Sequence, residues 1–144
     1  DGKLYSNIYD RNCKLRDVSP ENGSETILLA EGVLSSIDQQ KVEMDGNYRL
    51  QYTFLQDGVR ISGECRAAGQ WILPLVSEQT EQVTIEENFV KIQKNKKIIT
   101  ILVKKGRMKL PYGTERIYQL VPGMEALKIA ILPENGEIDF CIGF

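Results

Sequence analysis

The 144-residue chain contains no histidine. This absence excludes the Ser-His-Asp and Cys-His nucleophile systems, His-ligated zinc and the commonest general base. No apolar run approaches the ~20 residues that cross a bilayer, so we expect no membrane span. The glycine-rich phosphate loops GxxxxGK[ST] and GxGxxG are also missing. The sequence therefore lacks the most common catalytic and nucleotide-binding signatures.

Cysteine is scarce, with residues only at positions 13, 65 and 141 and no CxxC pair. This spacing argues against a structural zinc site and a thioredoxin-type motif. One disulfide among Cys13, Cys65 and Cys141 with a leftover thiol is one interpretation. Three reduced, half-buried thiols that pack as small apolar side chains are the interpretation that we favour.

Charge of one sign does not dominate, since 18 Lys and Arg face 20 Asp and Glu for a net of −2. The field of the whole chain therefore does not favour nucleic acid or an anionic membrane. Residues 91–109, however, hold eight basic side chains and no acidic one. They could bind an anionic polysaccharide, or they could guard the ends of an apolar strand against aggregation. No aromatic residue in this segment could stack a base, which argues against nucleic acid.

Residues 48–65 carry the clearest structural pattern. Apolar and polar residues alternate there on both sides of Asp57-Gly58, a pair that favours a two-residue type I′ turn. We therefore predict a β-hairpin that pairs Phe54 with Ile61, Tyr52 with Gly63 and Leu50 with Cys65. In that register an aromatic ring covers a glycine.

Further strand candidates follow at short spacing, separated by turn residues such as Pro122-Gly123 and Asn135-Gly136. The run 98–103 places apolar residues on both faces of a strand, which indicates a central strand covered on both sides. About ten short strands predict an all-β fold, an antiparallel β-sandwich formed by a single domain over residues 1–144. The candidates outside the hairpin are Leu4–Tyr9, Glu25–Leu34, Lys41–Met44, Trp71–Val76, Gln82–Glu86, Phe89–Ile92, Lys97–Val103, Arg116–Val121, Ala126–Leu132 and Glu137–Phe144.

Carboxylates and turns offer weaker candidates for chemistry. Glu64, Glu137 and Asp139 could supply the carboxylate pair of a sugar-cleaving enzyme, although exposed strand faces are polar by default. Tyr with Arg or Lys could serve a uronate lyase, but no spacing singles out such a set. We predict no cofactor or metal, while calcium binding at 45–47 or 134–137 stays open beside the simpler interpretation of both segments as turns.

Trp71 opens an apolar run that contains Pro74, and a proline there indicates an edge strand or a bulge. The indole could form a sugar-stacking platform or pack in the core. Together with the basic segment it completes our predicted glycan-binding set, which is Lys94, Lys96, Lys97, Lys104, Lys105, Arg107, Lys109 and Trp71.

A family resemblance rests on strand rhythm and on short elements. These are Tyr52-Thr53-Phe54, Asp57-Gly58-Val59, the run Trp71–Ser77, Val83-Thr84-Ile85, Val90-Lys91-Ile92 and Tyr118–Gly123. Over residues 40–144 the chain resembles the C-terminal β-sandwich of secreted bacterial polysaccharide lyases, notably the heparinase II/III-like group. The catalytic residues of that group lie mostly on a helical toroid and on the central sheet. This chain shows neither the toroid nor a histidine, so no catalytic residue carries over.

The resemblance implies a non-catalytic module of a secreted or periplasmic glycan-processing system. Such a module would pack on a larger carbohydrate-active protein or bind anionic polysaccharide. Two alternatives stay open: a small secreted lyase that uses Tyr, Arg and Lys, and a structural interaction domain without a ligand. A cleft lined by Arg and Tyr would favour the enzyme, and an apolar patch around Trp71 would favour docking.

Overall fold

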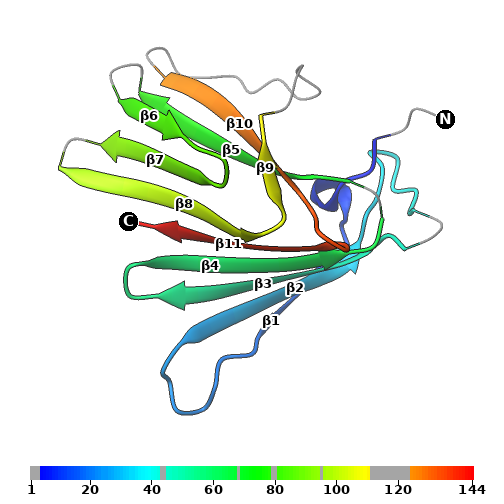
Figure 1. Ribbon diagram of the computed structural model, residues 1–144. Coiled ribbons are helices and arrows are strands. Elements are labelled where there is room, and N and C mark those ends of the chain that lie inside the picture. The colour runs from blue at the N-terminus through cyan, green and yellow to red at the C-terminus, as the bar shows by residue number, and fades with distance from the viewer. Residues whose placement is uncertain (1–3, 43–44, 68, 79–80, 95, 111–123) are drawn as a thin grey trace.

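A computed structural model describes the chain except for residues 1–3, 43–44, 68, 79–80, 95 and 111–123, with residues 124–127 described by their backbone alone. The described residues form eleven strands and one short 3-10 helix, and they contain no α-helix (Figure 1). The elements are η1 (Asn7–Tyr9), β1 (Lys14–Asp17), β2 (Thr26–Val33), β3 (Asn47–Leu55), β4 (Gly58–Cys65), β5 (Trp71–Glu78), β6 (Gln82–Ile85), β7 (Phe89–Lys94), β8 (Lys97–Lys105), β9 (Arg107–Lys109), β10 (Met124–Leu132) and β11 (Glu137–Gly143).

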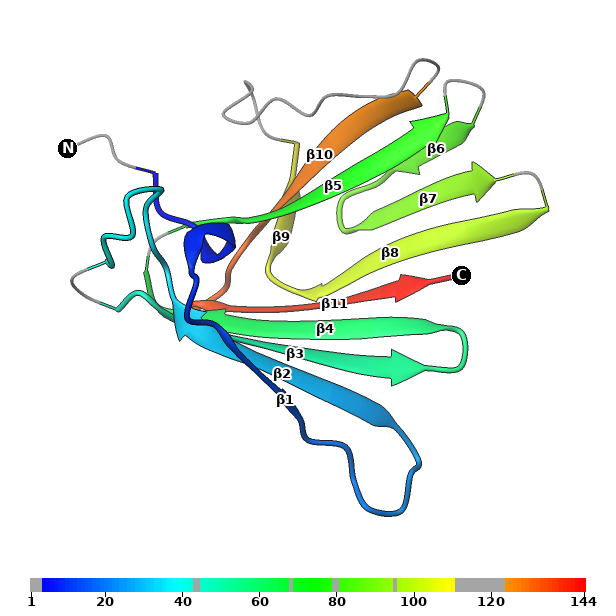
Figure 2. The ribbon, with the colours of Figure 1, turned by 180° about the vertical axis from the view of Figure 1, so that it is seen from behind.

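The strands form two antiparallel sheets of unequal width. The larger has the order β1-β2-β3-β4-β11-β8-β7-β6, and the smaller has the order β5-β10-β9. The last strand, β11, lies between β4 and β8 and so joins two groups of strands that are consecutive in the sequence (Figure 2). This arrangement confirms the predicted all-β sandwich, while the assignment of residues 1–144 to a single domain stays a prediction.

The core lies between the two sheets, because alternate side chains of each strand point inward. Ile129 and Ile131 of β10 are fully buried, and they belong to the same apolar cluster as Ile101 of β8 and Phe140 of β11. Burying one such side chain contributes about 2 kcal/mol to stability. Both sheets therefore contribute to the apolar interior.

The β3–β4 hairpin forms as predicted, but its register is shifted by two residues. Tyr52 lies opposite Ile61, Leu50 opposite Gly63, and residues 56–57 form the turn. A shift of two keeps every side chain on its predicted face. The reason lies in Gly58, where a Cβ would collide with the carbonyl oxygen of Ile142 on β11. This glycine is therefore needed for close approach within the sheet, and its φ is not positive.

Most of the other strand predictions are confirmed within one or two residues. The predicted strand Leu4–Tyr9 is wrong, because it contains η1, whose N-terminus is capped by the Ser6 hydroxyl accepting from the Ile8 N–H at 3.3 Å. Within Lys41–Met44 the described residues form only a bridge from Lys41 to Ser35. The candidate Arg116–Val121 lies outside the described residues. The sequence patterns did not indicate the short strands β1 and β9.

Strand β8 lies inside the larger sheet, between β11 and β7, as its apolar run predicts. The prediction that both of its faces are covered is wrong. Ile101 and Val103 point into the core, whereas Ile98 and Leu102 are 43% and 44% exposed on the outer face. No helix in the described part of the chain is long and apolar enough to cross a bilayer.

The carboxylate of Asp10 links the N-terminal segment to the larger sheet through hydrogen bonds. It accepts hydrogen bonds from the Val33 N–H at 2.9 Å, the Tyr48 hydroxyl at 3.2 Å and the Asn12 N–H at 2.9 Å. Burial alone would raise the pKa of Asp10, but these hydrogen bonds and the charge of Lys41 together lower it. Burial, followed by the proximity of Cys13 and Asp10, strongly raises the pKa of Tyr48. The carboxylate occupies space that a side chain at residue 32 would fill, so Gly32 is required there.

Candidate functional site

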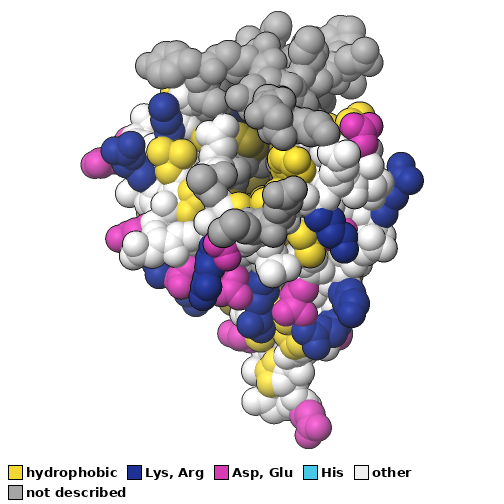
Figure 3. All heavy atoms as spheres, turned by 90° about the vertical axis from the view of Figure 1, so that its right-hand side faces the viewer, with side chains coloured by type: hydrophobic (Ala, Val, Ile, Leu, Met, Phe, Trp, Pro, Cys, Tyr) yellow, Lys and Arg dark blue, Asp and Glu magenta, His cyan; other side chains and the backbone are white. Residues whose placement is uncertain are grey.

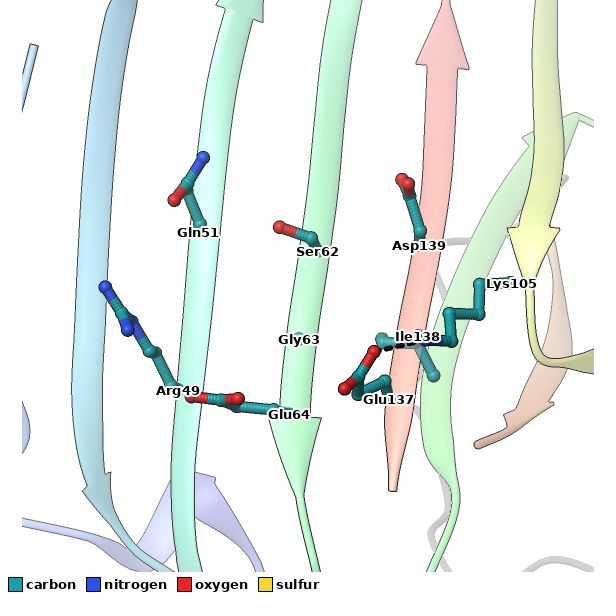
Figure 4. A pocket seen from close by; sticks show the side chains of 9 residues that line it. All are labelled: Arg49, Gln51, Ser62, Gly63, Glu64, Lys105, Glu137, Ile138 and Asp139. Atoms are coloured by element: carbon teal, nitrogen blue, oxygen red, sulfur yellow. Dashed lines mark hydrogen bonds and ion pairs between the residues drawn. The ribbon is translucent and has the colours of Figure 1, made fainter. Parts of the chain in front are cut away.

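A shallow groove of about 490 Å³ crosses the outer face of the larger sheet. It spans β3, β4, β11 and β8. Its polar side chains point away from the core because they alternate with the buried ones, whereas Ile138, which also borders the groove, is a core residue. In Figure 4 the side chains of Arg49, Gln51 and Ser62 stand on neighbouring strands beside those of β11. The complete lining is Arg49, Gln51, Ser62, Gly63, Glu64, Lys105, Glu137, Ile138 and Asp139.

A row of charged residues crosses five strands at one end of the groove. Each member lies directly opposite the next member on the neighbouring strand. The signs of the charges alternate along the row except at Glu64 and Glu137, two carboxylates that face each other. Like charges in that position repel each other, and a cation on each side offsets the repulsion. Lys105 forms an ion pair with Glu137, and the pKa of Lys105 is raised by that hydrogen bond. From β1 to β11 the row contains Lys14, Glu31, Arg49, Glu64 and Glu137.

A β-bulge on β8 brings Lys105 into the groove. Cys141 pairs with Leu102 and Phe140 with Val103, but Asp139 pairs with Lys105, so the register shifts at this point. Without the extra residue, Lys104 would face Asp139, and Lys105 would point toward the core. The bulge therefore adds a cation to the outer face next to two carboxylates of β11.

Asp139 is held by Arg60 on the neighbouring strand. The guanidinium donates two hydrogen bonds to the carboxylate, at 3.0 and 2.5 Å, and the pKa of Arg60 is raised by this hydrogen bonding and by the negative charge. The Asp139 side chain is only 16% exposed. This bidentate geometry is the strongest form of an Arg–carboxylate pair, so Asp139 is fixed in position.

The three carboxylates that the sequence analysis singled out, Glu64, Glu137 and Asp139, lie together in this groove. Two of them are paired with cations, Glu137 with Lys105 and Asp139 with Arg60. A carboxylate whose oxygens already accept hydrogen bonds from a neighbouring cation has fewer lone pairs free to accept a proton from a substrate. The arrangement suits the binding of polar groups better than proton transfer.

The basic segment 91–109 does not form one continuous surface. As expected, its charges flank the apolar part of β8, and the nine residues of that strand separate the two ends by roughly 26 Å. At one end Lys94 binds Glu81 at 2.8 Å, and Lys96 and Lys97 are exposed. The other end contains Lys104, Lys105, Arg107 and Lys109. Of the predicted glycan-binding set, only Lys105 lines the groove, and glycan binding by the set stays a prediction.

Trp71 is half-buried on β5 and packs against the core. Its ring lies 3.2 Å from the position that a Cβ on Gly63 would occupy, so the indole fills the space left by that glycine. Pro74 lies on an edge strand of the smaller sheet, as predicted. On the outer side of the same strand Ile72 and Val76 are 41% and 47% exposed.

Of the two segments left open for calcium, 134–137 forms a turn, whereas 45–47 leads from a bend at Asp45 into β3 at Asn47. Asn135 and Gly136 adopt positive φ values of 53° and 80° between the bridged residues Glu134 and Glu137, as a tight hairpin turn requires. Asp45 also has a positive φ, of 57°. Among the residues that the structure describes, no three His, Cys, Asp or Glu residues gather as metal ligands would.

Exposed apolar side chains also gather at one end of the sandwich, around η1. Leu4, Ile8 and Ile37 are 54%, 51% and 69% exposed, and we call these three residues the η1-end patch. A hollow of about 190 Å³ lies beside them, lined by Leu4, Tyr9, Ser36, Ile37 and Asp38. Figure 3 faces this end and shows apolar side chains among charged ones of both signs. Large apolar groups at such exposure often mark an interaction surface.

The sequence analysis missed Arg49, Arg60, Gln51 and Ser62 as site residues. They occupy the polar positions of the predicted hairpin, so their common face was visible in the sequence. What the sequence did not show is that β11 and β8 continue that face.

Comparison with known proteins gives two matches. The family model described as Ulvan lyase C-terminal domain matches residues 1–143. A "Broad-specificity ulvan lyase" from Formosa agariphila is 26% identical over 138 residues, which cover 91% of this chain and 21% of the relative. The chain therefore spans about a fifth of the length of that relative. A relation to the heparinase II/III-like group stays a prediction.

Proposed function

The chain belongs to the family of ulvan lyase C-terminal domains, and from this premise we propose that it is a non-catalytic module of a polysaccharide lyase. In this proposal it packs on the larger, catalytic part of its enzyme. Because a polysaccharide too large to enter the cell must be cut outside the cytoplasm, the proposal places the module in a secreted or periplasmic protein.

The observation that carries the packing role is the η1-end patch. Two of its three side chains, Leu4 and Ile37, line a hollow, and the third, Ile8, belongs to η1. A larger catalytic part that packs on the module would cover these exposed apolar side chains. Covering these side chains would stabilise the pair by about 25 cal/mol for each Å² of apolar surface removed from water.

The non-catalytic role is supported by the state of the groove. Two of its carboxylates are neutralised by cations on neighbouring strands. In that arrangement Glu137 and Asp139 have fewer oxygens free to take a proton from a uronate. A second role, retention of anionic polysaccharide, is favoured by the arginine and lysine side chains on the outer face of the larger sheet.

The packing role is tested in a lyase that carries this chain as its C-terminal part. Ile37→Asp should separate the thermal unfolding of the module from that of the catalytic part, giving two transitions instead of one. Ile98→Asp is the matched control, because Ile98 is also exposed but lies at the far end of β8 (Figure 1). A single transition in both variants would contradict packing through the η1-end patch.

The non-catalytic role is tested on the chain by itself. Incubated with ulvan, it should release no unsaturated uronates, followed by their ultraviolet absorbance. Release of such products would overturn the proposal.

A further inference from the structure

We propose that the groove on the outer sheet face binds an acidic segment of a polysaccharide, with Arg49 and Lys105 facing its anionic groups and Gln51 and Ser62 facing its hydroxyls. This proposal specifies a site for the proposed retention of anionic polysaccharide, and it takes the class of ligand from that proposed function. It does not depend on the packing role, which uses other residues.

The first support is the charge of the face. Its in-register residues carry six cations and four carboxylates, a net of +2 on a chain whose overall net is −2. The excess of cations belongs to the whole outer face, because the lining of the groove itself has two cations and three carboxylates. Such a face attracts anions over about a Debye length, roughly 8–10 Å at ordinary salt. The cations are Lys14, Arg16, Arg49, Arg60, Lys91 and Lys105, and the carboxylates are Glu31, Glu64, Glu137 and Asp139.

The second support is that Arg49 and Lys105 have further hydrogen-bond donors that a ligand can reach. The side chain of Arg49 is 51% exposed, and its ion pair with Glu31, at 3.7 Å, is longer than a hydrogen bond. Lys105 is 40% exposed and bonds Glu137, while an ammonium group carries three donors. Both side chains can therefore donate to a carboxylate or a sulfate on a ligand.

The third support is the spacing across the groove. Arg49 lies on β3 and Lys105 on β8, with β4 and β11 between them, so the two strands are roughly 14 Å apart. Gln51, Ser62 and Asp139 form the next row across the same strands. Amide, hydroxyl and carboxylate groups in a row suit the hydroxyls of sugar rings, while the two cations suit charges spaced along the chain.

The same pattern disfavours a nucleic acid. Its phosphates follow one another without a break, so several would meet Glu64, Glu137 or Asp139 and be repelled. No aromatic residue lines the groove to stack a base. A polysaccharide, in contrast, can turn its hydroxyls toward the carboxylates. The groove therefore fits a glycan with separated anionic groups better than a polyphosphate.

The test is the affinity of this chain for immobilised ulvan and heparin at low salt. The double variant Arg49→Gln, Lys105→Gln should bind roughly threefold to tenfold more weakly, because it loses two exposed charge contacts. The matched control, Lys96→Gln with Lys97→Gln, removes the same charge from the far end of β8 and should bind within twofold of the unmodified chain. Far-UV circular dichroism should be unchanged in both variants.

A second pair of variants reverses the sign of the effect. Glu64→Gln removes a carboxylate from the groove and should strengthen binding, whereas Glu87→Gln removes an exposed one outside it and should not. The proposal is overturned if the control double variant weakens binding as much as the groove variant. It is equally overturned if Glu64→Gln and Glu87→Gln change the affinity for the glycans to the same extent. A loss of affinity for single-stranded DNA alone in the Arg49→Gln, Lys105→Gln variant would also overturn it. A negative result here leaves the thermal unfolding of Ile37→Asp unaffected, so the two proposals fail separately.

Discussion

Replacing Gly32 with alanine would place a methyl group where the Asp10 carboxylate lies. The added Cβ would overlap Oδ2 of Asp10 and would lie 2.7 Å from the Tyr48 hydroxyl oxygen. Because Gly32 is part of β2 and is paired with Tyr48 on β3, its backbone has little freedom to move away. The carboxylate must therefore leave, and the Val33 N–H and the Tyr48 hydroxyl lose their acceptor.

The expected cost follows from those two hydrogen bonds. Each bond to a charged acceptor contributes about 1.5 kcal/mol or more, so Gly32→Ala should lower the free energy of unfolding by about 3 kcal/mol. For a domain with a typical urea dependence of about 2 kcal/mol per molar, the midpoint would fall by about 1.5 M. Trp71, the single tryptophan, is half-buried against the core, so its fluorescence reports the transition.

Two controls separate this cause from a general effect of alanine. At Gly69 the nearest atom to an added Cβ is 3.9 Å away, so Gly69→Ala should change stability by less than about 0.5 kcal/mol. In an Asp10→Ala background the overlap with the carboxylate is gone, while the close approach to Tyr48 remains, so Gly32→Ala should cost less than it does beside Asp10. An equal cost in both backgrounds would refute the role assigned to Asp10.

The remaining predictions concern titration and thiol reactivity. Hydrogen bonding lowers the pKa of Asp10 in the folded chain below its ordinary value of 3.8. The contribution of Asp10 to the free energy of unfolding is therefore complete above pH 3.8, and it is lost as the pH falls through the lower pKa of the folded chain. The stability difference between the unmodified chain and Asp10→Asn in urea should therefore shrink below about pH 4, and a constant difference down to about pH 2 would contradict this. Cys13 is exposed, whereas burial raises the pKa of the Cys65 thiol. A disulfide reagent should therefore modify Cys13 rapidly and Cys65 only on unfolding, and a rapid phase equally strong in Cys13→Ser would show that this assignment is wrong.

The sandwich could be predicted from the sequence because its main signal is local. Alternation along residues 48–65 and along β11 fixes which side chains face the core, and a register shift of two residues leaves that unchanged. The shift itself was not predictable, since Gly58 is required by Ile142, which is 84 residues away. Tyr48 covers Gly32 of β2 and Trp71 covers Gly63, whereas the predicted partner of Gly63, Tyr52, lies opposite Ile61.

The groove was only partly visible in the sequence. Arg49 and Glu64 share a face of one hairpin, which the alternation predicts. Their proximity to Glu137 depends on the pairing of β11 with β4, which is non-local. The position of Lys105 in the groove depends on a β-bulge in β8, and no residue pattern in the sequence indicated that bulge. The sequence predicted that the charges of the basic segment 91–109 flank a strand, but it did not show that only Lys105 among them lines the groove.

The central position of β11 has a consequence for how the chain acquires its structure. Strands β1–β4 and β6–β8 pair with neighbours in the sequence and can form early. The larger sheet stays in two pieces until β11, which ends at Gly143, is available to join them. During synthesis on the ribosome the edges of β4 and β8 would therefore stay exposed until β11 emerges, and in that period they are open to pairing with other chains.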